Sequence, residues 1–214
     1  MAFRNFKMVG YVIYGRGSFN QLDEILAPHR KTDAPIIFLV DHFFNGKPLV
    51  NRIPLRGNDK IIFADVTYEP KTTYVDDLAN KLKQEFGTVS GIIGIGGGST
   101  MDLAKAVSLM MNNPGSSADY QGWDLVKHAG VYKAGIPTLS GTGAEVSRTT
   151  VLTGPTKKLG MNSDFTPFDQ IVLDPELTKD APVNQRFYEM HKHLCVHNIL
   201  LENSDLLGKE LPSG

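Results

Sequence analysis

The chain has 214 residues, of which 41% are hydrophobic and 21% charged, and its formal net charge is −1. These proportions are typical of a soluble globular protein and exclude a disordered chain. The near-zero net charge excludes the broad positive field that nucleic acid or an acidic membrane surface would require, so neither partner is expected.

Targeting signals are not recognisable in the sequence. The positive charges of residues 1–7 are not followed by the apolar run of a signal peptide, and no stretch approaches the roughly 18 apolar residues of a membrane helix. The single cysteine, Cys195, cannot form an internal disulfide, which fits a reducing compartment. A cytoplasmic location is the simplest interpretation.

The first half of the chain alternates between predicted helices and strands. A helix is predicted from Ser18, which has capping-box spacing with the residue three positions later, to Pro28. The apolar run 36–40, stopped by Asp41, is typical of a strand buried on both faces of a parallel sheet. A second strand is predicted at 60–64.

Further strands and helices continue this alternation. Thr73 and Asp76 have capping-box spacing at the start of an amphipathic helix, and residues 91–95 predict a strand that leads into a glycine-rich turn and another helix. The pattern predicts an α/β fold, namely a doubly wound, Rossmann-like, mostly parallel sheet with helices on both faces. Residues 46–59 look like an insertion rather than a core element.

After Glu145 the pattern changes to β. Strands are predicted at 149–153 and 170–173, with a hairpin around 154–158, so a β-hairpin extension is expected on the α/β domain. No internal repeat or low-complexity tract is present in the sequence.

Residues 94–99 place glycines between a buried strand and a helix. Glycines there let the backbone approach a ligand, and the free N–H groups of the helix start favour phosphate. Ser99 is expected to cap this helix, and Asp102 to accept backbone N–H bonds. The structural alternative is a tight turn that only permits strand–helix packing, but three consecutive glycines in a βαβ context favour nucleotide or phosphate binding.

Two other features qualify this prediction. Asp119 lies at the distance of the acidic residue in a dinucleotide fingerprint, but it follows a loop rather than a strand, which argues against an ordinary Rossmann fingerprint. The loop 135–146 places hydroxyls and glycines before Thr142 and Glu145, another pair with capping-box spacing. Alone, this loop is best interpreted as a strand end followed by a helix start, although it could also wrap a pyrophosphate or ribose.

Together the two loops resemble the iron-containing (group III) alcohol dehydrogenase family. Residues 96–102 are similar to its glycine–serine–aspartate turn and 137–146 to its threonine–glycine loop, and residues 157–160 and 172–178 are similar to the family's later segments. Order and spacing agree across about residues 8–185. The resemblance implies the N-terminal domain of a dehydroquinate synthase-like fold, and an oxidoreductase that transfers a hydride from a primary alcohol to NAD with the help of a divalent metal.

The resemblance also implies roles for single residues. The positions assigned to the cofactor are Asp41, Gly97, Gly98, Ser99, Asp102, Thr138, Thr142 and Lys158. Asp41 would meet the adenosine ribose hydroxyls, which favours NAD over NADP because a carboxylate repels a 2′-phosphate. The turn and Asp102 would hold the pyrophosphate, the two threonines would close over it, and Lys158 would reach a ribose. By themselves, Asp41 is an ordinary polar strand end and Lys158 a solvated hairpin lysine. Leu139 stands where many members have a second threonine.

A finer resemblance within the family is carried by residues 14–19, 120–125 and 158–164. It implies a sugar-acid substrate, 3-deoxy-manno-octulosonate, whose C8 hydroxyl would be oxidised to an aldehyde ahead of amination in lipopolysaccharide sugar synthesis. The expected partner is a small-molecule alcohol or sugar acid, and a homodimer is a further expectation. A lyase like dehydroquinate synthase is a less favoured alternative, because the loop 137–146 resembles the dehydrogenases more.

In the family, the metal (Fe or Zn) is held by one aspartate and three histidines of a helical second domain. The resemblance assigns 1–182 to the NAD-binding domain and 183–214 to a divergent tail at the start of that second domain. His197 aligns with a histidine ligand and His193 replaces the aspartate, and such an i,i+4 pair can bind a metal, although a solvated helix face is the alternative. No catalytic residue is assigned, and the chain by itself is expected to bind nucleotide weakly and to oxidise no alcohol.

The alternative function is a non-catalytic remnant that binds a nucleotide or a partner protein. In that case the helix from Ser99 and the strand near Ile171 are expected to leave apolar area exposed for pairing.

Overall fold

The computed structural model describes residues 5, 7–31, 33–179 and 181, which form two sheets. The larger has six strands in the order β1-β9-β6-β4-β2-β3, all parallel to their neighbours, and the smaller has the order β5-β8-β7. The strands are β1 (Tyr11–Tyr14), β2 (Ile36–Asp41), β3 (Lys60–Ala64), β4 (Gly91–Gly96), β5 (Gly122–Trp123), β6 (Tyr132–Pro137), β7 (Thr149–Thr153), β8 (Lys158–Asn162) and β9 (Gln170–Leu173).

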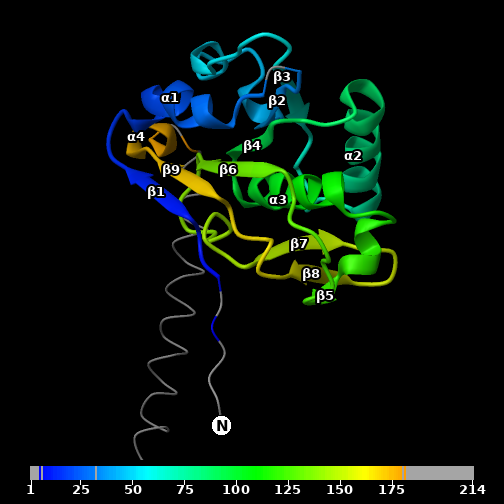
Figure 1. The fold of residues 1–214 in the computed structure, drawn as a ribbon. Coiled ribbons are helices and arrows are strands. Elements are labelled where there is room, and N and C mark those ends of the chain that lie inside the picture. The colour runs from blue at the N-terminus through cyan, green and yellow to red at the C-terminus, as the bar shows by residue number, and fades with distance from the viewer. Residues whose placement is uncertain (1–4, 6, 32, 180, 182–214) are drawn as a thin grey trace, which may run out of the picture.

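Helices cover both faces of the larger sheet (Figure 1). The α-helices are α1 (Leu22–Leu26), α2 (Thr72–Phe86), α3 (Gly98–Asn112) and α4 (Pro175–Thr178), and the 3-10 turns are η1 (Ser18–Gln21), η2 (Ala27–His29), η3 (His42–Phe44), η4 (Val50–Arg52) and η5 (Ser117–Tyr120). Side chains of β2 alternate between two cores: Ile37 and Leu39 pack with α2 and α3, whereas Phe38 packs with α1 and α4. The predicted α/β fold class is confirmed.

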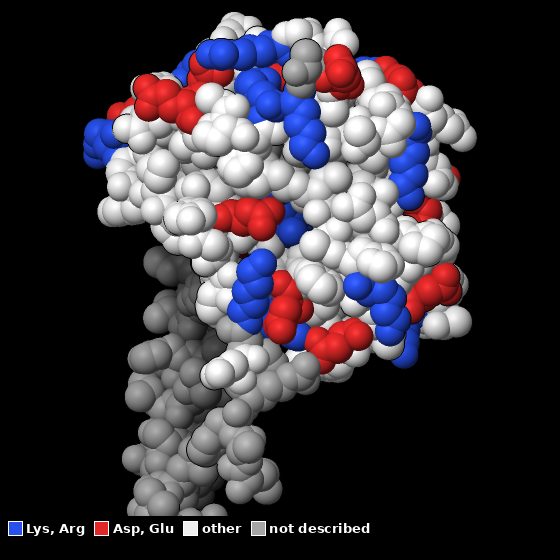
Figure 2. Space-filling model, viewed as in Figure 1, with Lys and Arg blue, Asp and Glu red and all other residues white. Residues whose placement is uncertain are grey.

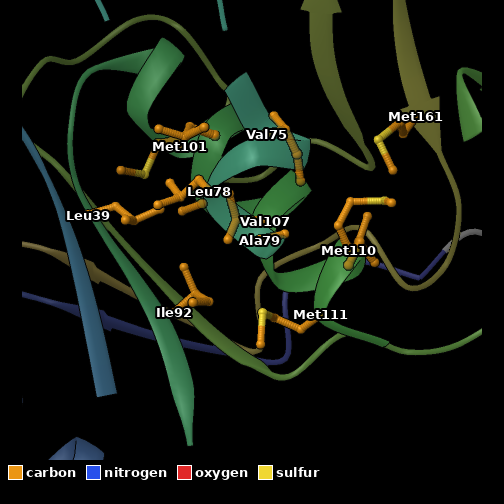
Figure 3. Close-up of a cluster of buried hydrophobic side chains, with 14 of the residues drawn as sticks. Leu39, Val75, Leu78, Ala79, Ile92, Met101, Val107, Met110, Met111 and Met161 are labelled. Carbon is orange, nitrogen blue, oxygen red and sulfur yellow. The ribbon is translucent and has the colours of Figure 1, made fainter. Parts of the chain in front are cut away.

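The core on the α2–α3 face is rich in methionine. Figure 3 shows Met101, Met110 and Met111 of α3 grouped with side chains of α2 and the sheet, and Met161 of β8 reaching toward them. Flexible, unbranched methionine side chains fill irregular space, here the junction between α3 and the smaller sheet. This core joins the β7–β8 hairpin to the main domain.

The order of the strands creates a switch point between β2 and β4. The chain passes from β2 to β3 on one side, then crosses back through α2 to β4, and continues through α3 to β6 on the other side. In open parallel sheets, ligands bind beyond the carboxyl ends of the strands where the order reverses in this way. The topology therefore directs attention to the residues that follow β2 and β4.

Strands were predicted better than helix starts. The strands expected at 36–40, 60–64, 91–95, 149–153 and 170–173 are present, as is the hairpin between β7 and β8. The last strand, β9, does not join that hairpin but lies between β1 and β6 in the larger sheet. The strands β1 and β5 were not predicted, and of β6 only the end was predicted, as the strand end at the start of 135–146.

All four capping expectations were wrong, and for Asp76 and Ser18 the structure shows other partners of the polar groups. Asp76 accepts bonds from the Ser116 hydroxyl (2.6 Å) and the Ser117 N–H (2.7 Å) instead of capping α2. The Ser18 hydroxyl donates to a carbonyl of β9, and neither it nor Ser99 caps a helix. At Thr142 no helix begins; residues 144–146 form a turn.

Residues 46–59 are more than an insertion. Ile53 is buried, and the Asp59 carboxylate accepts a bond from the Ile36 N–H (2.8 Å) at the start of β2 while also pairing with Arg30. The segment is thereby fixed on the α1 face of the sheet. Its position matters because part of it forms a wall of the cavity at the switch point.

The apolar surface expected of a partner-binding remnant, on the helix from Ser99 and the strand near Ile171, is not exposed. Ile171 is 1% exposed, and residues 103–111 of α3 are all buried, so neither element leaves apolar area exposed. The exposed large apolar residues include Tyr11, Val12 and Tyr14 of the edge strand β1 instead. On the face shown in Figure 2, positive and negative side chains are interspersed. None of the described helices is long and apolar enough to cross a membrane.

Candidate functional site

A cavity of about 590 Å³ lies at the switch point of the larger sheet. Asp41 at the end of β2, Gly97 after β4 and Thr138 after β6 line it from the strand ends. Residues 42–44, 47–49 and Arg52 form one wall, and residues of α4 with its following turn form another. The structure thus brings together three of the eight predicted cofactor residues, from three separate strands.

The two glycines at the end of β4 have different roles. A Cβ on Gly96 would lie 2.3 Å from the Thr100 hydroxyl and 2.9 Å from the Asp41 Cβ, so Gly96 is needed for packing between β2, β4 and α3. A Cβ on Gly97 would meet no atom within 4 Å and would project where Gly97 lines the cavity. The packing at Gly96 therefore agrees with the structural interpretation of this turn, and the open space at Gly97 leaves room for the ligand of the other interpretation.

Gly97 is also the N-cap residue of α3, with φ −81° and ψ −169°. No side chain caps this helix, so its first N–H groups are left for another acceptor at the cavity edge. Unpaired N–H groups and the positive end of a 15-residue helix together favour an anion such as a phosphate. The site therefore fits the pyrophosphate of a dinucleotide.

Asp41 presents a carboxylate at the rim of this cavity. Its Oδ1 accepts the Phe43 N–H (3.0 Å) and lies 3.4 Å from Nδ1 of His42, while the side chain stays 21% exposed. The local bonds of the described residues use Oδ1, so Oδ2 is available to a ligand hydroxyl. His42 Nδ1 also lies 3.2 Å from the Ala64 carbonyl, which fixes the ring beside the carboxylate.

The other predicted loop residues surround the cavity without lining it. A Cβ on Gly98 would lie 3.0 Å from the Thr142 Cβ, so the glycine turn and the threonine–glycine loop touch at this point. The Thr138 N–H donates to the Gly96 carbonyl (2.9 Å), which joins the two loops a second time. Ser99 follows in the first turn of α3.

Asp102 does not accept the N–H bonds expected at the start of α3. Its carboxylate lies 3.7 Å from Nζ of Lys105, and the Val151 N–H of β7 is hydrogen-bonded to it. Burial raises the pKa of Asp102, although Lys105 and the Val151 N–H oppose the shift. The residue therefore faces the β7 side of the helix rather than its end.

Lys105 was not predicted from the sequence. It is fully buried in α3, where a lysine within the apolar run 103–111 is the signal that could have revealed it. Its ammonium is hydrogen-bonded by the loop that follows Thr142. The cavity wall formed by 42–44 and 47–49, including the Phe43 ring under the Lys47 ammonium, was also missed.

Two predicted positions are not brought to the cavity. Lys158, at the start of β8, forms an ion pair with Glu69 and its side chain is 53% exposed, which agrees with a solvated hairpin lysine. Its contact with a ribose stays a prediction that this geometry does not favour. His193 and His197 lie outside the described residues, as does the whole tail 183–214, so the domain boundary at 182 is also untested. Within the described part of the chain, no three His, Cys, Asp or Glu residues are grouped to hold a metal.

The comparisons with known proteins decide the family. The model of the iron-containing alcohol dehydrogenase family matches residues 10–175, which is most of the chain. The chain belongs to this family.

Individual members resemble the chain in sequence and in fold. The sulfoacetaldehyde reductase of Bilophila wadsworthia is 34% identical over 64% of this chain and 35% of its own length. The NAD-dependent methanol dehydrogenase of Bacillus methanolicus is 31% identical over 83% of this chain and 47% of its own length. The crystal structure of the Bifidobacterium kashiwanohense sulfoacetaldehyde reductase in complex with NAD⁺ is 26% identical, with a TM-score of 0.68 over 85% of this chain and 49% of that chain. The chain thus spans half or less of the length of these alcohol dehydrogenase relatives.

Proposed function

We propose that this chain forms the NAD-binding half of an iron-type alcohol dehydrogenase and binds the cofactor in the cavity at the switch point. The observation that carries the proposal is Gly97, whose missing side chain leaves open space at the start of α3. A related sulfoacetaldehyde reductase has been crystallised with NAD⁺, which supports the choice of ligand. NAD supplies the acceptor for the hydride that leaves the alcohol carbon.

The residues of the chain have separate tasks in this proposal. The N–H groups that follow Gly97 hold the pyrophosphate, while Thr138 and Thr142 close over it. The Oδ2 atom of Asp41 accepts hydrogen bonds from the adenosine ribose, and its negative charge disfavours a 2′-phosphate. Gly98 and Ser99 complete the turn around the phosphates, whereas the Asp102 carboxylate, which faces Lys105 and the Val151 N–H, supports the start of α3 from the β7 side. A titration of the purified chain with NAD and NADP, followed by calorimetry, tests this assignment.

A substitution at Asp41 gives the sharpest test of the preference for NAD. Asp41→Asn keeps an oxygen for the Phe43 N–H but loses the charge, so we expect NAD affinity to fall about tenfold or more while NADP affinity falls less or rises. Asp65→Asn is the matched control, because Asp65 is an exposed carboxylate that also lies near Nδ1 of His42 (3.8 Å) but does not line the cavity. Equal losses for both nucleotides in Asp41→Asn would remove the role of Asp41 in discrimination.

The complete reaction needs a metal that polarises the alcohol oxygen. We propose that the 214 residues by themselves bind NAD without oxidising an alcohol, since the matched relatives whose names state the activity are about twice as long. Purified chain mixed with Fe²⁺ or Zn²⁺, NAD and 1-propanol is expected to form no NADH. Alcohol-dependent NADH formation above that of a metal-free blank would contradict this prediction.

For the substrate we propose the C8 hydroxyl of 3-deoxy-manno-octulosonate, and hence a role in lipopolysaccharide sugar synthesis. The support is the resemblance of residues 120–125 and 158–164, two segments that lie together because β5 pairs with β8. Saturation-transfer NMR on the NAD-loaded chain is expected to detect the sugar acid and not 1-propanol. An equal response to both ligands would contradict the choice of sugar acid.

A further inference from the structure

Lys105 is a buried charge that none of the assigned cofactor contacts uses. Its side chain is 0% exposed, and it lies among the buried residues 103–111 of α3. An ammonium removed from water is costly unless its hydrogens are bonded, so a lysine at this position requires a set of acceptors. Those acceptors identify what the residue does.

The acceptors come from one segment of the chain. Nζ donates to the Ala144 carbonyl (2.7 Å), the Ser147 hydroxyl (3.0 Å), the Ser147 carbonyl (3.3 Å) and the Thr149 carbonyl. The three hydrogens of the ammonium are shared among these four oxygens, and the Asp102 carboxylate lies 3.7 Å away. One side chain of α3 therefore binds three backbone carbonyls and one hydroxyl within residues 144–149.

This segment is the second half of the threonine–glycine loop. Residues 138–148 contain no helix or strand, and short-range hydrogen bonds join residues within the loop: Val146 N–H to the Gly143 carbonyl, Ala144 N–H to the Thr142 hydroxyl, and the Ser147 hydroxyl to the Ala144 carbonyl. At its first end the loop is tied by the Thr138 N–H to β4, and at its other end by Lys105. Thr142, which packs against Gly98, lies between these two ties.

We infer that Lys105 is a positioning residue of the cofactor site, whose ammonium clamps residues 144–149 onto α3 and so keeps Thr142 over the glycine turn. This inference rests on the proposed function, because the loop is positioned for the cofactor. Loss of the clamp lets the loop move away from the pyrophosphate side, so cofactor affinity falls although Lys105 does not touch the cavity.

The charges around Lys105 add a dependence on pH. Burial lowers the pKa of Lys105 to about 8, while Asp102 on the same helix and Glu145 in the loop raise it, and Lys133 of β6 lowers it further. The negative charge of Glu69 in turn raises the pKa of Asp102. Because the ammonium loses a proton as the pH rises through this value, the clamp is weaker in alkaline solution, and NAD affinity is expected to fall above about pH 8.

The experiment compares Lys105→Met with Lys133→Met. Lys133 is a matched control, since it is a buried lysine of β6 whose ion pair is with Asp169. We expect Lys105→Met to weaken NAD binding about tenfold or more, to abolish the alkaline fall in affinity, and to speed amide hydrogen exchange in residues 138–149. Lys133→Met is expected to keep wild-type affinity at neutral pH and wild-type exchange in that loop, with the alkaline fall in affinity moved to higher pH because Lys133 lowers the pKa of Lys105.

Ser147→Ala provides a milder variant if Lys105→Met does not fold. It removes one of the four acceptors, so we expect a smaller loss of NAD affinity and faster exchange confined to the same loop. A Lys105→Met protein that melts earlier but keeps the affinity and the pH profile of the wild type would overturn the inference. Failure of the wild-type chain to bind NAD would instead overturn the proposed function, and the loop exchange measured without NAD separates the two cases.

Discussion

Gly97→Val is expected to abolish NAD binding without unfolding the protein. The valine side chain would enter the space where Gly97 lines the cavity, and no protein atom lies within 4 Å of its Cβ. The backbone at Gly97, with φ −81° and ψ −169°, is open to any residue. We expect affinity to fall at least about 100-fold in calorimetry, with a melting temperature close to that of the wild type.

Gly96→Ala is the matched control for this prediction. Its Cβ would collide with Thr100 and with the Asp41 Cβ, so the expected effect is a loss of about 1–3 kcal/mol of stability. Substitutions at the two neighbouring glycines should therefore have different effects: Gly97→Val lowers NAD affinity, and Gly96→Ala lowers stability. Wild-type NAD affinity in folded Gly97→Val would refute the placement of the pyrophosphate at this turn.

Asp174→Ala is expected to lower the free energy of unfolding more than Gly96→Ala or Gly97→Val. The carboxylate is 2% exposed and accepts three backbone N–H bonds, from Gly17 (3.0 Å), Phe19 (3.1 Å) and Glu176 (3.0 Å). Removing it leaves three donors without their acceptor, of which the buried Phe19 N–H is the most costly. We expect a loss of about 3 kcal/mol in denaturant unfolding at pH 7.

The pH dependence of this variant follows from the same bonds. Burial alone would raise the pKa of Asp174, but the N–H groups of Glu176, Gly17 and Phe19 outweigh it and hold the pKa below its usual value. A carboxyl group whose pKa is lowered by folding stabilises the protein above its unfolded pKa and loses that effect as the pH falls. The difference in stability between wild type and Asp174→Ala should therefore shrink below about pH 4. A difference that stays constant from pH 7 to pH 3 would contradict this origin.

The strands were predictable because burial on both faces leaves a continuous apolar run, as in β2 and β4. Helix starts were not, because capping-box spacing is a local signal that tertiary partners can override. Asp76 has the spacing of a cap but bonds to Ser116 and Ser117, about 40 residues away in the sequence. No local pattern contains that information.

The candidate site was also predictable only in part. Asp41, Gly97 and Thr138 follow strand ends, and parallel strands bring their carboxyl ends to one edge of a sheet, so their meeting follows from the fold class. The clamp by Lys105 does not follow from it, since its acceptors begin 39 residues further along the chain. The wall at 42–44 and 47–49 was missed because the neighbouring prolines and glycines suggest an insertion.

The pairing of β1 with β9 has a consequence for the order in which the domain is assembled. Among the strands of the described residues, Tyr11–Tyr14 comes first in the sequence, yet its neighbour in the larger sheet, Gln170–Leu173, comes last. During synthesis the first strand must therefore wait until nearly all of the domain has left the ribosome, and the closure spans about 160 residues. Such long-range pairing is slow, so we expect β1 to dock last in refolding, after the β2–β4–β6 centre has formed.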